Sequence, residues 1–175
     1  MPIHDVSMPE SVTIYTDGAV SGNGTAGSYG GWAVVVVVGT QERELSGAER
    51  GATNQQMELR AAIEGLRALD RPCRVALHCD SSYVVECFLQ GWSRRWLENG
   101  WRNSKGRPVG NRALWEELLE LTAVHEVTWV KVPGHDGVEL NERCDRLAVA
   151  ARERLAAELA QIGRRVRRSA PQLSS

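Results

Sequence analysis

Hydrophobic and polar residues alternate over residues 12–17, which is the two-residue period of a strand with one buried face. After a glycine-rich stretch, residues 32–38 form a continuous run of apolar residues, most of them β-branched. Residues 41–46 are mainly polar, as expected for a strand at the edge of a sheet. Three strands separated by turns predict an antiparallel meander.

The periodicity becomes helical at residue 54. Leu59, Ile63 and Leu66 recur at spacings of three and four residues, which predicts an amphipathic helix over residues 54–69. Glu58 lies beside this apolar stripe and is therefore expected to border the buried face. Further strands are predicted at 74–79 and 126–132, and further helices at 83–90, within 91–110, at 113–124 and from 140 onwards.

The predicted order of elements, βββαβαααβα, indicates an α/β fold. Its centre is a five-stranded mixed sheet, in which parallel strands joined through helices continue the antiparallel meander and helices flank the sheet. One domain is expected over residues 11–158. A flexible N-terminus (1–10) precedes it, and a basic, disordered tail (159–175) follows it.

The composition is that of an ordinary globular domain, with 42% hydrophobic and 25% charged residues. No apolar run approaches the ~20 residues of a membrane span, and residues 1–10 lack the basic start and apolar stretch of a signal peptide. We therefore expect a cytoplasmic protein with no membrane association. The cysteines show no CxxC or zinc-type spacing, and we expect reduced core thiols at Cys73, Cys79, Cys87 and Cys144.

The net charge of −1 by itself argues against binding to nucleic acid. The charge is unevenly distributed, however, because residues 89–112 contain one acid, Glu98, and several cations interleaved with tryptophans. Local positive charge of this kind is suited to docking on phosphates. The cations are Arg94, Arg95, Arg102, Lys105, Arg107 and Arg112.

Four carboxylates stand within or directly after apolar segments of different predicted elements: Asp17, Glu58, Asp80 and Asp145. Acids are rarely buried unless they are paired or bind a metal. If the strands that end near Asp17 and Asp80 are neighbours, these two carboxylates converge at one end of the sheet. Two Mg²⁺ ions about 4 Å apart, bridged by such carboxylates, clamp the attacking and leaving oxygens of a phosphoryl transfer.

Four short motifs surround these acids: Tyr-Thr-Asp-Gly at 15–18, Thr-Asn-Gln-Gln-Met-Glu-Leu at 53–59, Asp-Ser-Ser-Tyr at 80–83, and Gly-His followed by Asn-Glu-Arg-Cys-Asp within 134–145. They occur in the order seen in type 1 ribonuclease H, and the chain resembles that family, in its bacterial form, over residues 12–155. The resemblance implies a ribonuclease H-like fold. It also implies a Mg²⁺-dependent endonuclease that cuts the RNA strand of RNA–DNA hybrids and leaves 5′-phosphate and 3′-hydroxyl ends.

The resemblance also implies roles for particular residues. Asp17, Glu58, Asp80 and Asp145 match the metal-binding and catalytic quartet, for two Mg²⁺ ions with Mn²⁺ as a possible substitute. His135 matches a catalytic loop histidine that assists proton transfer or product release, a role suited to imidazole because it titrates near neutral pH.

Further positions match substrate contacts of the family. Asn23, Asn54 and Gln55 match residues that read the RNA minor groove, where the 2′-hydroxyl distinguishes RNA from DNA. Thr53 and Asn111 match residues that hold a phosphate of the DNA strand. A basic protrusion is expected to contact the DNA strand through Trp92, Arg94, Arg95, Trp96 and Trp101, although these tryptophans are also compatible with a core role.

Two departures from the family pattern concern affinity. Ser82 stands where bacterial relatives often carry a longer amide, and residues 97–99 (Leu-Glu-Asn) replace a stretch that is often rich in lysine.

The alternative functions are a DNA-cutting nuclease of the same fold, such as a resolvase or integrase-like enzyme, a catalytically inactive hybrid-binding module, and a purely structural domain. An inactive module is expected to lose at least one of the acids. We expect no obligate protein partner and a monomer.

Overall fold

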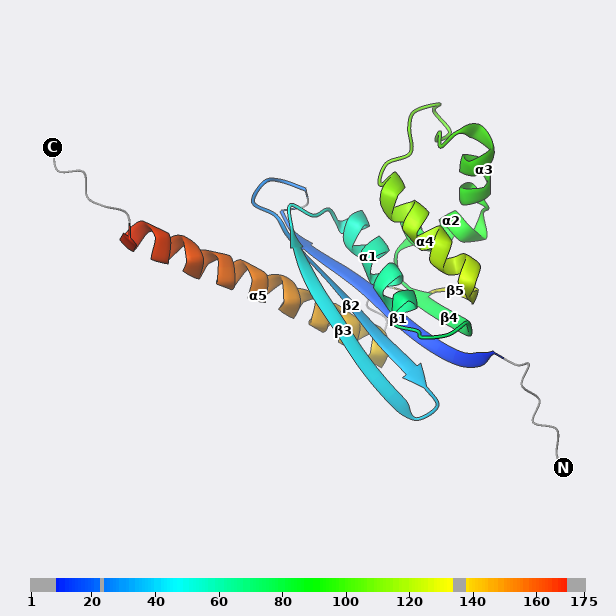
Figure 1. Cartoon of the computed structure of the whole chain (residues 1–175), viewed down its shortest axis with the longest axis horizontal. Coiled ribbons are helices and arrows are strands. Elements are labelled where there is room, and N and C mark those ends of the chain that lie inside the picture. The colour runs from blue at the N-terminus through cyan, green and yellow to red at the C-terminus, as the bar shows by residue number, and fades with distance from the viewer. Residues whose placement is uncertain (1–8, 23, 134–137, 170–175) are drawn as a thin grey trace.

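The computed structural model describes residues 9–22, 24–133 and 138–169, which contain one five-stranded mixed sheet with strand order β3-β2-β1-β4-β5 (Figure 1). β1 pairs antiparallel with β2, which pairs antiparallel with β3, while β4 lies parallel to both β1 and β5. The strands are β1 (Glu10–Ser21), β2 (Tyr29–Val38), β3 (Gln41–Arg50), β4 (Cys73–Cys79) and β5 (Glu126–Lys131).

The helices cover the two faces of the sheet unequally. α1, α2 and α4 belong to the larger hydrophobic cluster on one face, and α5 packs against β1, β2 and β3 on the other (Figure 1). The helices are α1 (Asn54–Arg67), α2 (Ser82–Leu89), α3 (Trp92–Asn99), α4 (Arg112–Val124) and α5 (Glu139–Ser169).

The alternating pattern of the strands explains the two clusters. Ile14 and Val34 point to the α1 face, whereas Ala33 and Val35 point to the α5 face, because successive side chains of a strand project to opposite sides. β2 is buried on both faces and is accordingly apolar throughout its second half. The element order, the meander and the edge position of β3 confirm the predicted fold class.

The end of the chain differs from the expectation. α5 continues to Ser169, whereas a disordered tail was expected from residue 159. The extension consists mainly of alanine, leucine, glutamine and arginine, which favour helix. It also continues a helix that is already docked on the sheet, so the cost of nucleation is not incurred again. Within the described part of the chain, no helix is both long and apolar enough to cross a membrane.

Candidate active site

Asp17 and Asp80 are placed side by side by the parallel pairing of β1 and β4. Thr16 is in register with Cys79, so the residue that follows each of them lies at the same end of the sheet. Asp17 is 5% exposed and its Oδ1 accepts a hydrogen bond of 2.8 Å from the backbone N–H of Gly18. The predicted convergence of Asp17 and Asp80 is therefore present, but β1 does not end near Asp17 as expected and continues to Ser21.

Glu58 reaches the same point because α1 lies very close to β1. A Cβ atom on Gly18 would lie 2.8 Å from the backbone nitrogen of Glu58, so only glycine permits this approach. The start of α1 is fixed by a capping box, in which Thr53 Oγ1 accepts from Gln56 N–H and Gln56 Oε1 accepts from Thr53 N–H. Glu58, one turn later, is 4% exposed.

Asp145 comes from the opposite face, on the first part of α5. A Cβ on Gly31 of β2 would lie 1.9 Å from the carbonyl oxygen of Ala148, so the helix backbone rests directly on the strand. The thiol of Cys144 also donates a hydrogen bond of 3.3 Å to the carbonyl of Tyr15. These two contacts fix the turn of α5 that carries Asp145.

All four predicted acids line one cavity of about 200 Å³, which we call the acidic pocket. Asn54, Asn141 and Glu142 also line it. Asn141 is 4% exposed and lies one helical turn before Asp145, so both face the pocket from the same side of α5. Sequence reasoning assigned no role to Asn141, although this spacing was visible within the motif.

The acids perturb one another strongly. Burial, followed by the charges of Asp80 and Asp145, raises the pKa of Asp17 from 3.8 to about 7. Burial and the charges of Asp17 and Asp80 hold the pKa of Glu58 well above its usual value. The free-energy cost of crowding these carboxylates is relieved by a cation bound among them.

The donor set fits a hard divalent cation. Carboxylate and amide oxygens are the ligands that Mg²⁺ prefers. In addition, Asn141 Oδ1 is buried and, within the residues that the structure describes, accepts no hydrogen bond. A buried acceptor without a donor is costly in a protein interior, and a cation or its bound water satisfies it.

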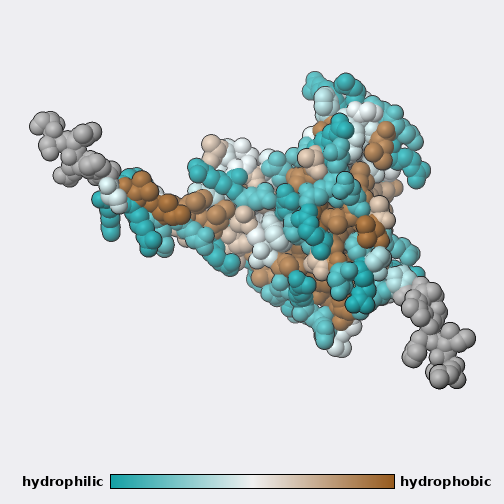
Figure 2. Space-filling model, in the orientation of Figure 1, coloured by the Kyte–Doolittle hydropathy of each residue, from teal (hydrophilic) through white to brown (hydrophobic). Residues whose placement is uncertain are grey.

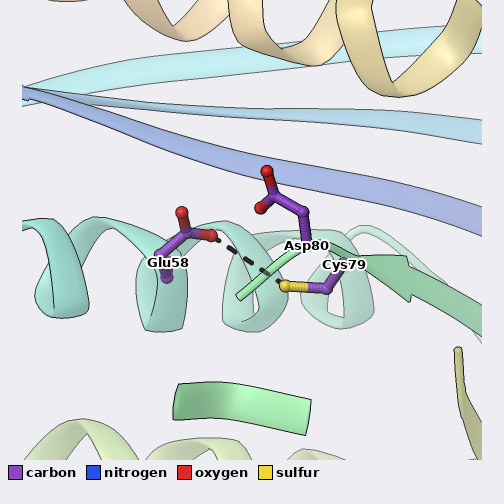
Figure 3. Close-up of side chains that lie close together, drawn as sticks. All are labelled: Glu58, Cys79 and Asp80. Atoms are coloured by element: carbon purple, nitrogen blue, oxygen red, sulfur yellow. Dashed lines mark hydrogen bonds between the residues drawn. The ribbon is translucent and has the colours of Figure 1, made fainter. Parts of the chain in front are cut away.

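Cys79 is a buried neighbour of the site that sequence reasoning treated only as a core thiol. Figure 3 shows its sulfur facing Glu58 beside Asp80, and the ligand atoms of the three residues lie within 4.8 Å of one another. The thiol donates to Glu58 Oε2 at 3.9 Å. Burial and the charge of Glu58 raise the pKa of the Cys79 thiol, so it remains protonated and acts as a donor.

Comparisons with known proteins agree with this geometry. The family model for RNase H matches residues 9–153, which is most of the chain. The chain belongs to the ribonuclease H family.

Relatives in this family are similar along most of their own length. Proteins named ribonuclease H from Moorella thermoacetica and Symbiobacterium thermophilum are each 53% identical to the chain, over 142 and 140 residues, covering 81% and 80% of it and 91% and 93% of the relatives. A crystal structure described as a type 1 RNase H with the type 2 active-site motif superposes with a TM-score of 0.74 at 32% identity, covering 85% of this chain and 74% of that one. The chain is therefore an enzyme of the ribonuclease H family.

The two residues expected to hold a DNA phosphate are joined by one hydrogen-bond network. Gln56, within the capping box of Thr53, donates from Nε2 to Asn111 Oδ1 at 3.3 Å. Asn111 Nδ2 donates to the hydroxyl of Tyr83, which also accepts from Trp115 Nε1. Asn111 has a positive φ of 58° and precedes α4. Gln56 and Tyr83 are positioning residues that the sequence reasoning did not identify.

The expected minor-groove contacts are only partly described. Asn54 and Gln55 are exposed on the first turn of α1, and Asn54 also lines the acidic pocket. Asn23 and His135 lie outside the described residues.

The expected contacts of the basic protrusion divide into two groups. Arg94 and Arg95 are exposed on α3 and Trp92 is half-buried. Trp96 and Trp101 are only 9% and 7% exposed, stack on each other, and belong to the main core. Their burial leaves little ring surface for a nucleic acid, because both rings pack in the core and Trp96 also contacts the ring of Trp115. Both rings therefore have a core role, and their contact with the substrate stays a prediction.

Proposed function

We propose that this ribonuclease H family enzyme hydrolyses the RNA strand of RNA–DNA hybrids with two Mg²⁺ ions and leaves 5′-phosphate and 3′-hydroxyl ends. The observation that carries the proposal is the convergence of Asp17, Glu58, Asp80 and Asp145 on one cavity from four different elements. Bound Mg²⁺ supplies an activated water and stabilises charge on the leaving oxygen. Mn²⁺ is expected to substitute because it also prefers oxygen ligands.

The side chains around the acidic pocket have different roles in binding the cations, orienting the acids and transferring a proton. The four carboxylates hold the cations, and the Cys79 thiol and the Gly18 N–H orient Glu58 and Asp17. Asn141 offers an amide oxygen on the α5 side of the pocket. His135 accepts or delivers a proton, a role that rests on the sequence motif alone.

Substrate recognition is assigned to two neighbouring surfaces. Asn54 and Gln55, together with Asn23, read the RNA minor groove with side chains that are donors and acceptors at once. Thr53 and Asn111 hold a phosphate of the DNA strand. The Thr53 hydroxyl accepts a bond from Gln56 N–H, so its own proton is available for a phosphate oxygen. Trp92, Arg94 and Arg95 extend this contact along the DNA strand.

The test is cleavage of an RNA–DNA hybrid labelled on either strand, with and without Mg²⁺, beside matched duplex DNA, duplex RNA and single strands. Mg²⁺-dependent cutting of only the RNA strand is expected, and its products are expected to be ligatable at the 5′ end without a kinase. Binding without cutting would assign the chain to an inactive hybrid-binding module. Cutting of duplex DNA would assign it to another nuclease of the same fold. A monomer is expected by analytical ultracentrifugation.

A further inference from the structure

Helix α5 has two parts with different surroundings. Its first part is buried on the sheet through Cys144, Ala148 and Ala151. After Ala151 none of its described residues is buried, and the helix projects away from the sheet (Figure 1). A long solvent-exposed helix contributes little to the core, so its surface chemistry indicates what it does.

One side of the projecting part is an arginine-rich surface. Gln161, Arg164, Arg165 and Arg168 follow the i, i+3, i+4, i+7 spacing that places residues on one helix face. They line a shallow hollow of about 310 Å³, and we call this surface the arginine face. Among the residues that the structure describes, none of its three arginines forms an ion pair.

The chemistry of the arginine face favours a phosphate-bearing polyanion. A guanidinium binds phosphate through two parallel N–H donors and is weakly hydrated, so it is suited to this contact. From Gln161 to Arg168 the helix rises roughly 10 Å, which is about the length of three successive phosphates of one strand. No acid stands between Glu158 and the end of the chain, so the local field is positive throughout.

Two other occupants fit less well. The neighbouring apolar stripe contains Ile162 and Val166, 55% and 64% exposed, and is visible as a brown band on the projecting helix in Figure 2. This stripe, which also contains Leu155 and Leu159, has no aromatic residue, whereas helices that lie on membranes usually insert tryptophan or phenylalanine as well. Self-association through the stripe would bring the arginines of two copies together, and like charges at close range are destabilising.

The position of the helix relates the arginine face to the acidic pocket. Asp145 lies beside Asp17 of β1, and Ala148 touches Gly31, close to where β2 begins opposite the end of β1. α5 therefore runs toward the end of the sheet where β1 ends, at Ser21, and leaves the sheet there. Arg164 lies roughly 29 Å along the helix axis from Asp145, which is the length of about nine base pairs of duplex.

We propose that the arginine face is a second phosphate-binding surface, which holds a hybrid duplex outside the region contacted by the catalytic domain. The proposal rests on the proposed function for the identity of the duplex. It predicts that hybrids extending more than about nine base pairs beyond the cleavage site gain affinity from α5, whereas shorter hybrids do not.

The experiment compares the parent protein with the variant R164A/R165A/R168A. Binding is measured by fluorescence anisotropy in EDTA over a salt series, using hybrids of about 8 and about 36 base pairs, because the shorter one cannot span the distance of about nine base pairs from the acidic pocket to Arg164 in any register. Removing the three arginines is expected to weaken binding of the long hybrid about tenfold and to reduce the slope of log K against log salt by roughly 2–3. Binding and cleavage of the short hybrid are expected to be unchanged.

Two control variants isolate the effect. R43A/R71A/R74A removes the same charge from exposed positions elsewhere and is expected to leave both affinities close to those of the parent. R164K/R165K/R168K keeps the charge and is expected to retain most of the salt slope. Circular dichroism of all variants is expected to show unchanged helix content, so a loss of binding is not a loss of fold.

The outcomes separate the two proposals. Equal loss on short and long hybrids, or an unchanged salt slope, would overturn the arginine face while leaving hybrid cleavage intact. A protein that cuts no hybrid but still shows the length-dependent arginine effect would overturn the proposed function only. Arginine-dependent binding to vesicles of phosphatidylglycerol without any length effect would replace the duplex with a lipid surface. A dimer of the parent that forms through α5, without any length effect on hybrid binding, would replace the duplex with a second copy of the chain.

Discussion

The acidic pocket and the arginine face carry opposite charges and are held in opposite ways. Asp17 and Glu58 are almost fully buried and are placed by backbone contacts that only glycine permits. The arginines of the arginine face are exposed on the part of α5 after Ala151, where none of the described residues is buried. Burying a charge costs free energy of folding unless the charge is paired or binds a cation. Exposing a charge costs little, and a single exposed charge contributes little to stability or binding unless other charges lie beside it. Disruption of the pocket should therefore have large, local effects, and disruption of an exposed surface small, cumulative ones.

The largest effect is expected from Asp17→Asn. A neutral amide does not bridge two cations, so kcat is expected to fall by roughly three orders of magnitude. The same variant relieves repulsion with Asp80 and Asp145, so the metal-free protein is expected to become more stable. Steady-state cleavage and thermal melting in EDTA measure the two effects. Asp70→Asn, at a side chain that is 82% exposed, is the matched control, and substantial activity in Asp17→Asn would contradict the metal assignment.

Packing beneath the pocket is tested by Gly31→Ala. The added methyl would meet the carbonyl of Ala148, so α5 must move, at a cost of about 1–3 kcal/mol in the free energy of unfolding. Activity is expected to fall as well, because Asp145 moves with the helix. Urea denaturation and hybrid cleavage are the measurements. Gly27→Ala introduces a methyl that meets no atom within 4 Å, and an equal loss of stability in that variant would remove the contact as the explanation.

The stability of the metal-free enzyme is expected to fall as pH rises from about 4 to about 7. In the folded protein Asp17 has a pKa of about 7 instead of 3.8, so the folded state holds a proton that the unfolded chain has released. Because the unfolded state binds fewer protons in this window, raising the pH favours unfolding. Denaturation in EDTA at several pH values is the measurement. The dependence of the free energy of unfolding on pH is expected to become weaker in Asp17→Asn and with saturating Mg²⁺. Identical pH dependence in the parent and the variant would refute the raised pKa of Asp17.

The smallest effect is expected at the exposed cations of α3. Arg94→Ala combined with Arg95→Ala is expected to raise KM a few-fold and to lower the salt slope by about two, with kcat unchanged. The double variant Arg71→Ala with Arg74→Ala removes the same charge from exposed ion pairs and is expected to leave KM unaltered. An unchanged slope in the α3 variant would exclude α3 from the binding surface.

Some features of the fold and of the acidic pocket could be predicted from the sequence, and others could not. The alternation at residues 12–17 and the spacing of Leu59, Ile63 and Leu66 predicted the elements correctly, because one buried face imposes its period on a strand or helix. The order of elements then predicted the mixed sheet. The four acids stood out because each is a charge in an apolar setting, and all four line the pocket.

Other features depended on contacts between segments far apart in the chain. Cys79 carries no local signal of its surroundings, and the spacing of Asn141 before Asp145 indicates a shared helix face but not its burial; the pairing of β4 with β1 and the docking of α5 bring both residues to the acids. The hydrogen bond between Gln56 and Asn111 crosses from α1 to the start of α4 in the same way. The burial of Trp96 and Trp101 could not be predicted from the sequence either, since a tryptophan beside arginines is compatible with either a core or a surface position.

The sequence alone therefore determined the succession of strands and helices, the sheet they form and the four acids of the pocket. Hydrophobic periodicity and a charged residue in an apolar segment can both be recognised from neighbouring residues in the chain. The tertiary structure alone decided how close the acids lie, how far their pKa values move and where α5 leaves the sheet. Those quantities depend on the close approach of α1 to Gly18 and of α5 to Gly31. An approach of this kind is set by the packing of the whole domain, and no single segment specifies it.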